Sequence, residues 1–409
     1  MIRLFINGLA ASAGGGLTYL RNVIPELARR ASVVATVLLN PALRRDCGDF
    51  PNIFFLDAAD SSSAARRFYR EQAALPKMIR DSGAHVLISA GNFALWNSPV
   101  PQILLSRNSL YTSADFARDL RARGDYALWA DTLIKGWLAK GSIRRAALTV
   151  APSEAFAHEL SEWAGKEVVA IHHGFNAEVF AGDSRAISAE AQAQLAEGQD
   201  ALRLLFVSHY NYYRNFETLF RAIPILKARM KGTKVKLYLT CHLDSDHNPG
   251  SYRAEAASAL VGDLRAEHDI VELGTVPYRS LHHLYRACHM YVTPAYAESF
   301  AHPLVEAMSS GLPVVASDIP VHREICREAA VYFPRFSPDA LANCVLQIHA
   351  HQTLAARLSQ AGCLRSRDFS WEKHVTSLLD LAEGLLRGRF SALRMHQLRP
   401  PSAHHDHEH

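Results

Sequence analysis

The stretch from Pro294 to Ser317, PAYAESFAHPLVEAMSSGLPVVAS, decides the fold of this chain. The run Met290–Thr293 just before it predicts a buried strand, and Pro313–Ala316 predicts the next one. Between the two strands a turn leads into a helix that opens at Pro303, because proline fits the first turn of a helix. The segment is therefore predicted to be strand, turn, helix and strand, which is the repeating unit of a covered parallel sheet.

Two carboxylates in this stretch, Glu298 and Glu306, stand eight residues apart. Glu298 precedes the helix and Glu306 lies about one turn into it, so both can line one pocket. The positive helix N-terminus and the amides of residues 300–304 suit a diphosphate, and carboxylates accept hydrogen bonds from sugar hydroxyls. The residues thus suggest a nucleotide-sugar site. An ordinary helix with a solvated glutamate at each position is the alternative.

Strand and helix patterns alternate along both halves of the chain. In the first half, strands are predicted at Ile2–Ile6, Val33–Leu39, Val86–Ser89, Gln102–Leu105, Leu148–Ala151 and Val168–Ile171. In the second half, the further strands are predicted at Leu202–Ser208, Lys234–Thr240, Ile270–Leu273 and Val331–Phe333. The sequence therefore predicts an α/β protein of two Rossmann-like, doubly wound domains. Their ligand cleft should lie at the carboxyl ends of both sheets.

Composition shifts set the predicted domain boundaries. Residues 1–180 form the first domain and residues 201–370 the second, and residues 181–200 form a surface connection rich in Ala, Gln and Glu. One long helix is predicted over 338–360, and a final helix over 371–390. The polar, histidine-rich tail, 391–409, is predicted to be disordered, although its HHDHEH end could also bind metal.

Composition excludes several classes of protein. Of 409 residues, 49% are hydrophobic and 21% are charged, which is typical of a globular chain, and a net charge of +4 gives no nucleic-acid footprint. The six cysteines are scattered without a C-x-x-C pair, so they are read as free thiols in a reducing compartment rather than as zinc ligands. The only D-x-D, at 244–246, is more typical of a solvated loop than of a metal site.

The N-terminus, MIRLFINGLAASA, imitates a signal peptide only superficially. Asn7 and Gly8 interrupt its apolar stretch, and no apolar run in the chain approaches the roughly 18 residues that span a bilayer. A first strand followed by a glycine-rich turn is the better interpretation. The protein is expected to stay in the cytosol.

The stretch 294–317 resembles the E-x7-E signature of glycosyltransferase family 4, the group 1 glycosyltransferases, usually written E-G-F-G-L-P-x-x-E-A-M-A-x-G-x-P-V-V-A-S. The matching residues are Glu298, Phe300, Pro303, Glu306, Ala307, Met308, Gly311, Pro313, Val314, Val315, Ala316 and Ser317. The departures are Ser299 and Ala301, which replace glycines, and His302, which replaces leucine. The resemblance implies that Glu298 contacts the donor sugar and Glu306 the ribose hydroxyls. The donor would also meet the turn formed by Phe300, Ala301, His302 and Leu304.

A second stretch, VSHYNYYRNFETLFRAIPIL at 207–226, resembles the V-G-R-L-x-x-x-K-N segment of the same family. There an arginine and a lysine neutralise the donor diphosphate. Arg214 stands at the lysine position, and its forked donors suit phosphate. His209 replaces the arginine and offers a single donor when neutral. A helix-start surface cation at 214 and a merely packed histidine at 209 are the alternatives.

On the first domain the resemblance implies two further contacts. Gly14, Gly15 and Gly16 resemble the GG loop that approaches donor phosphate and acceptor, although a structural turn is the alternative, and Gly15 and Gly16 are the candidate donor contacts. Asn108, after the strand Gln102–Leu105, could bond a donor or acceptor hydroxyl or could cap the following turn.

The resemblance implies the GT-B fold, with an acceptor-side first domain and a nucleotide-binding second domain. It implies a retaining transfer from a nucleoside-diphosphate sugar to a glycan or lipid-linked acceptor in cell-surface polysaccharide synthesis. Glu298 and Arg214 are the predicted catalytic residues, and no metal or other cofactor is expected. A GT-B epimerase and an inactive nucleotide-sugar binding module are the rival interpretations.

A basic segment, Trp129–Arg145, bears on where the protein works. It mixes Lys135, Lys140, Arg144 and Arg145 with large apolar residues, as helices on anionic membranes do. A helix packed on its own domain with a solvated basic face is the favoured alternative. Peripheral contact with the inner face of the plasma membrane is therefore an open expectation.

Overall fold

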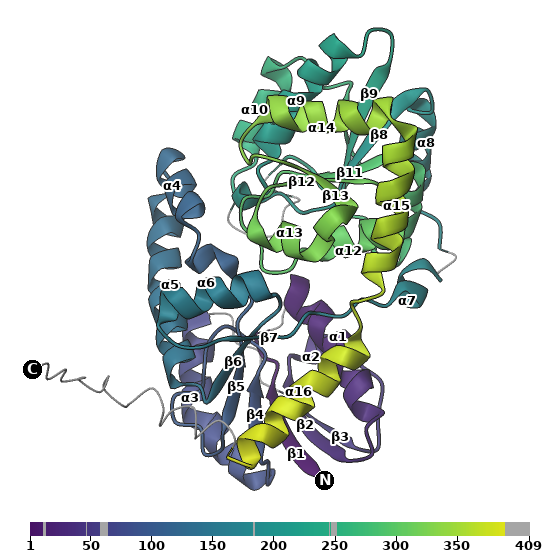
Figure 1. The fold of residues 1–409 in the computed structure, drawn as a ribbon. Coiled ribbons are helices and arrows are strands. Elements are labelled where there is room, and N and C mark those ends of the chain that lie inside the picture. Colours follow the sequence, from purple (N-terminus) through teal and green to yellow (C-terminus); the bar gives the residue numbers. More distant parts are fainter. Residues whose placement is uncertain are drawn as a thin grey trace, which may run out of the picture.

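The structure is a computed structural model that describes residues 1–10, 14–45, 47–57, 64–182, 185–244, 246 and 252–388. The histidine-rich tail predicted at 391–409 and residue 245 of the D-x-D lie outside these ranges. Within them the chain forms two domains stacked one above the other, each built on a parallel sheet between helices (Figure 1).

The first domain holds a seven-stranded sheet in the order β3-β2-β1-β4-β5-β6-β7. Its strands are β1 (Ile2–Asn7), β2 (Val33–Leu39), β3 (Ile53–Asp57), β4 (Val86–Ser89), β5 (Gln102–Leu105), β6 (Leu148–Ala151) and β7 (Val169–Ala170). Its helices are α1 (Gly14–Ala28), α2 (Pro41–Arg44), α3 (Ala64–Asp81), η1 (Ser109–Tyr111), α4 (Ala114–Ala122), α5 (Tyr126–Arg145) and α6 (Glu154–Ala164).

The second domain holds a six-stranded sheet in the order β10-β9-β8-β11-β12-β13. Its strands are β8 (Ala201–Phe206), β9 (Lys234–Leu239), β10 (Ile270–Glu272), β11 (Met290–Thr293), β12 (Val314–Ser317) and β13 (Ala330–Phe333). The helices from here to the end are α7 (Ala177–Ala181), α8 (Ala189–Glu197), η2 (Tyr212–Arg214), α9 (Phe216–Arg229), α10 (Glu255–Asp263), η3 (Tyr278–Ser280), α11 (Leu281–Ala287), α12 (His302–Ser309), α13 (Pro320–Cys326), η4 (Arg327–Ala329), α14 (Pro338–Ala350), α15 (Gln352–Ser366) and α16 (Trp371–Leu386). Strand order and helix coverage make both domains doubly wound and Rossmann-like, which confirms the predicted fold class.

Two local expectations need adjustment. Part of the segment expected to connect the domains is a helix, α8, which is capped by Ser188 and receives a hydrogen bond from Tyr238 at the carbonyl of Gln194. The single long helix that helical periodicity favours after Pro338 is broken at His351, whose backbone is not helical (φ −124°, ψ 89°), so α14 and α15 are separate.

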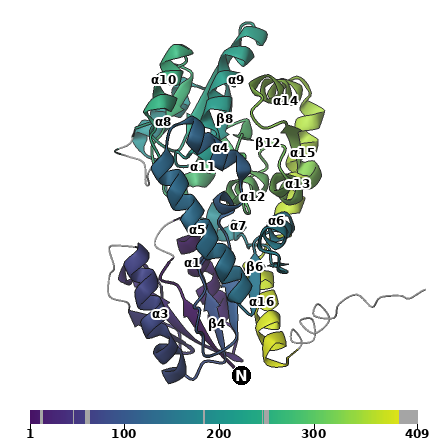
Figure 2. The same ribbon diagram turned by 90° about the vertical axis from the view of Figure 1, so that its left-hand side faces the viewer.

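Helix α16 follows the second domain in sequence but lies across the first (Figure 1). Its apolar face, which includes Val375, Leu378 and Ala382, is buried in the same cluster as the core of β1, β2 and α1. At the other side, α4 and α5 rise from the first domain, and α4 stands beside the second (Figure 2). Helix α16 thus packs on the first domain, and α4 lies next to the second domain.

Polar contacts join the α4–α5 corner to the second domain. Arg123 pairs with Glu217 at 2.8 Å, and Tyr296 donates to Asp119 at 2.7 Å. On the opposite side, Glu324 of α13 accepts from the backbone N–H of Ala155 at 2.7 Å, at the start of α6. These contacts hold the two domains in one arrangement around the space between their sheets.

The chain crosses between the domains twice, and the two crossings touch at Gly174. A Cβ atom placed on Gly174 would lie 2.1 Å from the backbone nitrogen of Trp371, the first residue of α16. The contact is backbone on backbone, so no side-chain rotation could relieve it. Glycine at this position is therefore a requirement of close approach rather than of an unusual φ angle.

We expect Gly174→Ala to destabilise the protein, because the added methyl group forces the two crossings apart. Overpacking of this kind costs about 1–3 kcal/mol or more, and the melting temperature should fall accordingly. Gly141→Ala, in α5, is the matched control. Its Cβ would meet only the mobile end of Arg145, and alanine favours a helix by up to about 1 kcal/mol. Equal melting temperatures for the two variants would contradict the assigned contact.

Candidate active site in the interdomain cleft

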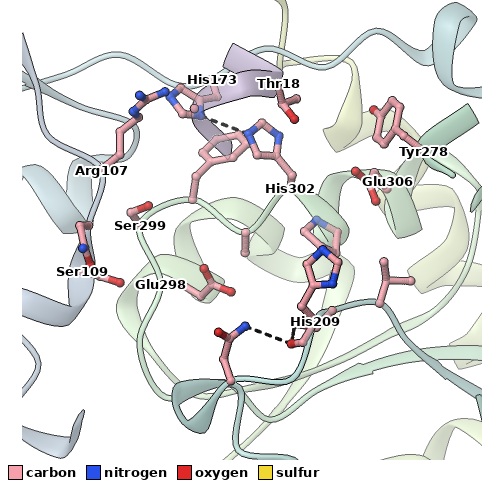
Figure 3. Close-up of a pocket in the computed structure, with 18 of the residues that line it drawn as sticks. Thr18, Arg107, Ser109, His173, His209, Tyr278, Glu298, Ser299, His302 and Glu306 are labelled. Atoms are coloured by element: carbon pink, nitrogen blue, oxygen red, sulfur yellow. Dashed lines mark hydrogen bonds between the residues drawn. The ribbon is translucent and has the colours of Figure 1, made fainter. Parts of the chain in front are cut away.

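A cavity of about 680 Å³ lies between the two domains. Its walls come from segments that follow the carboxyl ends of strands: residues 90–92 after β4, 107–110 after β5, 173–176 after β7, 207–209 after β8 and 298–303 after β11. This is where doubly wound sheets bind ligands. Figure 3 shows the side chains that reach this cleft from both domains.

An ion pair between Arg214 and Glu298 lies at the centre of the second-domain wall. Arg214 Nη1 donates to Glu298 Oε1, and both side chains are largely buried, with exposed fractions of 17% and 8%. Since two charges removed from water need each other, the pair keeps both side chains in the cleft while no ligand compensates either one.

The neighbouring Asn215 fixes the position of this pair. It adopts the left-handed conformation (φ 56°) between η2 and α9, where asparagine is tolerated better than most residues. Its Nδ2 donates to the carbonyl of Pro294 at 3.1 Å, and its Oδ1 accepts from Thr218 at 2.9 Å. Asn215 therefore ties the turn that carries Arg214 to the loop that carries Glu298.

Glu306 lies deeper in the same wall, on α12. Its Oε2 accepts a hydrogen bond of 2.8 Å from the Tyr285 hydroxyl, and burial raises its pKa to about 7. A carboxyl group with this pKa is close to half protonated at neutral pH. It accepts hydroxyl donors from a ligand most strongly as the carboxylate, and its protonated form keeps a carbonyl oxygen as an acceptor.

Helix α12 begins at the cleft, with Ala301, His302 and Pro303 in the lining. Ala301 adopts a left-handed conformation (φ 67°), which favours glycine, the residue that the family signature has there. The ring of His302 stacks on His173 at 5.2 Å between centroids, and Nε2 of His302 bonds Nδ1 of His173 at 3.1 Å. The N-terminus of α12 therefore lies at the cleft, next to the two stacked imidazole rings.

His209 lines the cleft after β8. Burial lowers its pKa below 6.5, and the charge of Arg214 lowers it further. His209 is therefore neutral at pH 7, and it would offer a phosphate one neutral donor rather than a second positive charge.

The cleft brings together most of the predicted site residues. Those in its lining are Gly16, Asn108, His209, Arg214, Glu298, Phe300, Ala301, His302 and Glu306. Leu304 is outside the lining because its side chain is buried in the core under α12, and Gly15 lies in the first turn of α1. Asn108 uses its side-chain oxygen as a cap, accepting from Leu110 N at 3.0 Å, so the capping alternative describes its present contact.

Sequence reasoning missed two residues of the first-domain wall, Arg107 and His173. Both follow the carboxyl end of a parallel strand, β5 and β7 respectively, and that position was the available signal. His173 is buried, and burial together with nearby His302 keeps its pKa well below 6.5. Arg107 donates through Nη2 to the Ala90 carbonyl and lies over the Tyr19 ring at 4.7 Å.

The described ranges hold neither a metal-binding cluster nor a membrane-spanning helix. They contain no group of three or more His, Cys, Asp and Glu side chains that could hold a metal ion. None of their helices combines the length and the apolar character needed to cross a bilayer.

Known proteins with similar sequences are glycosyltransferases. Residues 187–365 match the family model described as "Glycosyl transferases group 1". The chain is 32% identical over 108 residues to O-antigen chain mannosyltransferase B of Escherichia coli, a match that covers 26% of this chain and 28% of that protein. It is 27% identical over 227 residues to a phosphatidyl-myo-inositol mannosyltransferase of Mycobacterium tuberculosis, covering 54% of each. The matches thus span from about a quarter to about half of these relatives' lengths.

Solved structures with the same architecture cover nearly the whole chain. A sucrose-phosphate synthase of Thermosynechococcus elongatus superimposes with a TM-score of 0.74 at 19% identity, covering 95% of this chain and all of that one. The Anabaena protein HepE, in complex with UDP, superimposes with a TM-score of 0.67 at 15% identity, covering 94% and 100%. The fold is GT-B. The similarity in sequence to the group 1 glycosyltransferases lies in the second domain, residues 187–365.

The raised pKa of Glu306 predicts that the stability of the protein depends on pH. Because the folded protein holds this proton up to about pH 7, against about 4.5 in an unfolded chain, the carboxyl group favours folding below pH 4.5. That contribution, at most about 3 kcal/mol, is lost as the pH rises from 4.5 to 7. We expect the stability of Glu306→Gln relative to wild type to increase across this range, as measured by denaturant unfolding at pH 5 and 7.5.

Tyr285→Phe provides the control for the cause of this shift. Removing the Tyr285 hydrogen bond, which lowers the pKa of Glu306, should move the loss of stability to higher pH. A stability difference between wild type and Glu306→Gln that does not change with pH would show that the carboxyl group titrates normally.

Proposed function

We propose that this chain is a retaining glycosyltransferase that moves a sugar from a nucleoside-diphosphate sugar to a glycan or lipid-linked acceptor. One observation carries the proposal: Glu306, the Arg214–Glu298 pair and the start of α12 line the same wall of one interdomain cleft. In order along that wall they offer an acceptor for ribose hydroxyls, positive charge for a diphosphate and a carboxylate for a sugar.

The similar proteins support this proposal by what their names state. The first matches include O-antigen chain mannosyltransferases of Escherichia coli and Salmonella typhimurium. Complexes of HepE contain UDP and UDP-glucose. We therefore infer a nucleotide-sugar donor and a role in cell-surface polysaccharide synthesis.

The proposed reaction needs little covalent chemistry from the protein. The acceptor hydroxyl oxygen bonds to the anomeric carbon on the face from which the phosphate departs, and its proton passes to a phosphate oxygen of the leaving nucleoside diphosphate. Glu298 and Glu306 are the carboxylates among the described lining residues, and both have partners already. We infer that Arg214 and the α12 N-terminus supply the positive charge for the leaving group without a metal.

Glu298→Gln separates transfer from nucleotide binding. The substitution keeps the size of the side chain but removes the negative charge that would face the anomeric centre, so turnover should fall at least about tenfold, or about 1.4 kcal/mol of barrier. Affinity for the nucleoside diphosphate should stay within about threefold or improve, because Arg214 loses its present partner. Steady-state transfer and calorimetric titration measure the two quantities.

The donor for this test comes from a thermal screen of UDP-, GDP- and ADP-sugars. A ligand at about 100 times its dissociation constant should add roughly 2.7 kcal/mol of stability. Loss of nucleotide affinity with unchanged turnover would make Glu298 a nucleotide contact. Binding without turnover would favour an inactive binding module, and donor conversion without acceptor would favour an epimerase.

We also propose that the first domain contacts the inner face of the plasma membrane through α5. Leu133, Ile134 and Trp137 lie on one face of this helix with exposed fractions of 50%, 62% and 71%, while its opposite face is buried. Lys140 and Arg144 pair with no carboxylate in the described part of the chain, so they keep their charge for an anionic surface. These three side chains make part of the outer face of α5 apolar, with basic side chains beside them, and this combination supports the proposal.

The membrane proposal predicts binding to anionic vesicles. Replacing Leu133, Ile134 and Trp137 together by serine should lower the affinity for phosphatidylglycerol vesicles at least tenfold, because each side chain would bury apolar area worth about 1.5–3 kcal/mol in the membrane. Cosedimentation with the vesicles measures this affinity. Leu364→Ser, on exposed Leu364 of α15 in the second domain, is the control and should bind like wild type. Equal binding by wild type and the triple variant would exclude this face of α5.

A further inference from the structure

Arg107 is a cation of the cleft that the proposed transfer does not use. It follows β5 on the first domain and reaches the cleft near His173 and His302 (Figure 3). Its backbone N–H donates to Asn92 at 2.8 Å, its Nη2 donates to the Ala90 carbonyl, and its guanidinium covers the Tyr19 ring. These contacts hold the side chain in one orientation.

The guanidinium group of Arg107 has a donor left over. Its Nη1 is buried and has no hydrogen-bond partner. A buried charged donor without a partner is costly, so such groups usually meet an acceptor in the functional state. The structure therefore leaves one strong, fixed donor unused beside the cleft.

No carboxylate balances the charge of Arg107 within the described ranges. Its ionisable neighbours are Tyr19, His173, His302 and His374, and none of them is an acid. The histidines are buried and neutral at pH 7, since burial keeps their pKa values low. The other cleft arginine, Arg214, differs in having Glu298 as its partner.

The place of Arg107 separates it from the nucleotide end of the cleft. It belongs to the first domain, whereas Glu306 and Arg214 belong to the second. Figure 3 shows Arg107 and Glu306 at opposite sides of the view, with Glu298 and His302 between them. A ligand whose ribose lies at Glu306 would therefore present its sugar end, or the acceptor beyond it, to Arg107.

We propose that Arg107 binds an anionic group, a carboxylate or a phosphate, carried by one of the two sugars that meet in the cleft. The inference rests on the proposed function for the identity of those sugars. The forked guanidinium matches both anions, and the neutral, partly aromatic surroundings strengthen such a bond by excluding water. The two possible carriers are a donor with an acidic sugar, such as a uronic acid, and an acceptor with a phosphate or carboxylate.

The test compares pairs of ligands that differ only in this charge. The donor arm uses UDP-glucose against UDP-glucuronate, and GDP-mannose against GDP-mannuronate. The acceptor arm uses glucose against glucose 6-phosphate and glucuronate, with the nucleoside diphosphate saturating. We expect the anionic member to bind at least about tenfold tighter in one arm, which then identifies the carrier.

Three variants assign that preference to Arg107. Arg107→Met keeps the apolar stem over Tyr19 and should reduce the preference to within about threefold, whereas Arg107→Lys should keep part of it. Arg203→Met is the matched control, because Arg203 also has an unpaired buried nitrogen beside a histidine but lies outside the cleft lining. It should bind every ligand like wild type.

The outcomes separate this inference from the proposed function. Equal binding of neutral and anionic ligands by wild type, with nucleoside diphosphate bound normally, overturns the role of Arg107 and leaves the proposed function standing. A preference for anionic sugars that depends on Arg107, without any nucleotide binding, supports the role of Arg107 and overturns the proposed function. An anionic preference that survives in Arg107→Met also overturns the inference. A purely structural role would lower the melting temperature of Arg107→Met and leave its preference unchanged.

Discussion

The crossing of the chain at Gly174 and Trp371 is the constraint on which the cleft depends. A side chain at 174 would overlap the backbone of Trp371, so the outgoing and returning segments lie closer than two ordinary residues could. The backbone N–H of Phe175 donates to the Phe369 carbonyl at 3.4 Å, and His374 Nδ1 bonds the His172 carbonyl at 2.8 Å. The crossing therefore ties the first turn of α16 to the end of β7, and the relative position of the sheets follows from it.

The same crossing builds the wall behind the candidate site. The ring of His173 packs at 5.6 Å from Trp371, and the hydroxyl of Tyr19 bonds Nε2 of His374 at 2.9 Å. Burial lowers the pKa of His374 to about 4, so the ring is neutral. Since Nδ1 then donates to the His172 carbonyl, Nε2 accepts from the Tyr19 hydroxyl. An interdomain joint made of neutral rings excludes water without adding charge. The few charges of the cleft are consequently little screened by water.

Much of the architecture was predictable from the sequence, because buried parallel strands leave a strong pattern. The strands at Val86–Ser89 and Met290–Thr293 and the start of the last helix at Trp371 have the predicted bounds. The strand Ile53–Asp57 was missed: it lies at the sheet edge, and its partly exposed residues lack the continuous apolar run of the inner strands. The break at His351 was missed as well, since neither proline nor glycine marks it.

The candidate site was predictable where side chains follow a spaced pattern, and not where tertiary contacts decide. Glu298 and Glu306 could be found because their spacing around one helix start implies a shared pocket. The pairing of Arg214 with Glu298 joins residues 84 apart, and the tie from Asn215 to Pro294 spans 79, so no local pattern encodes either. Arg107 stood beside a predicted contact, yet its significance lies in a buried Nη1 that has no hydrogen-bond partner among the described residues, which only the tertiary surroundings reveal.

Under the proposed function, the ion pair of Arg214 and Glu298 would differ between the protein before and after it binds a donor. Without ligand, each charge satisfies the other, and the carboxylate exerts little field on its surroundings. We infer that a bound diphosphate, carrying more negative charge than one carboxylate, draws Arg214 toward itself. Glu298 then loses its counter-ion at the moment when a sugar lies next to it. A carboxylate released in this way stabilises positive charge at the anomeric carbon more strongly than one that stays paired, so donor binding itself would prepare the site for transfer.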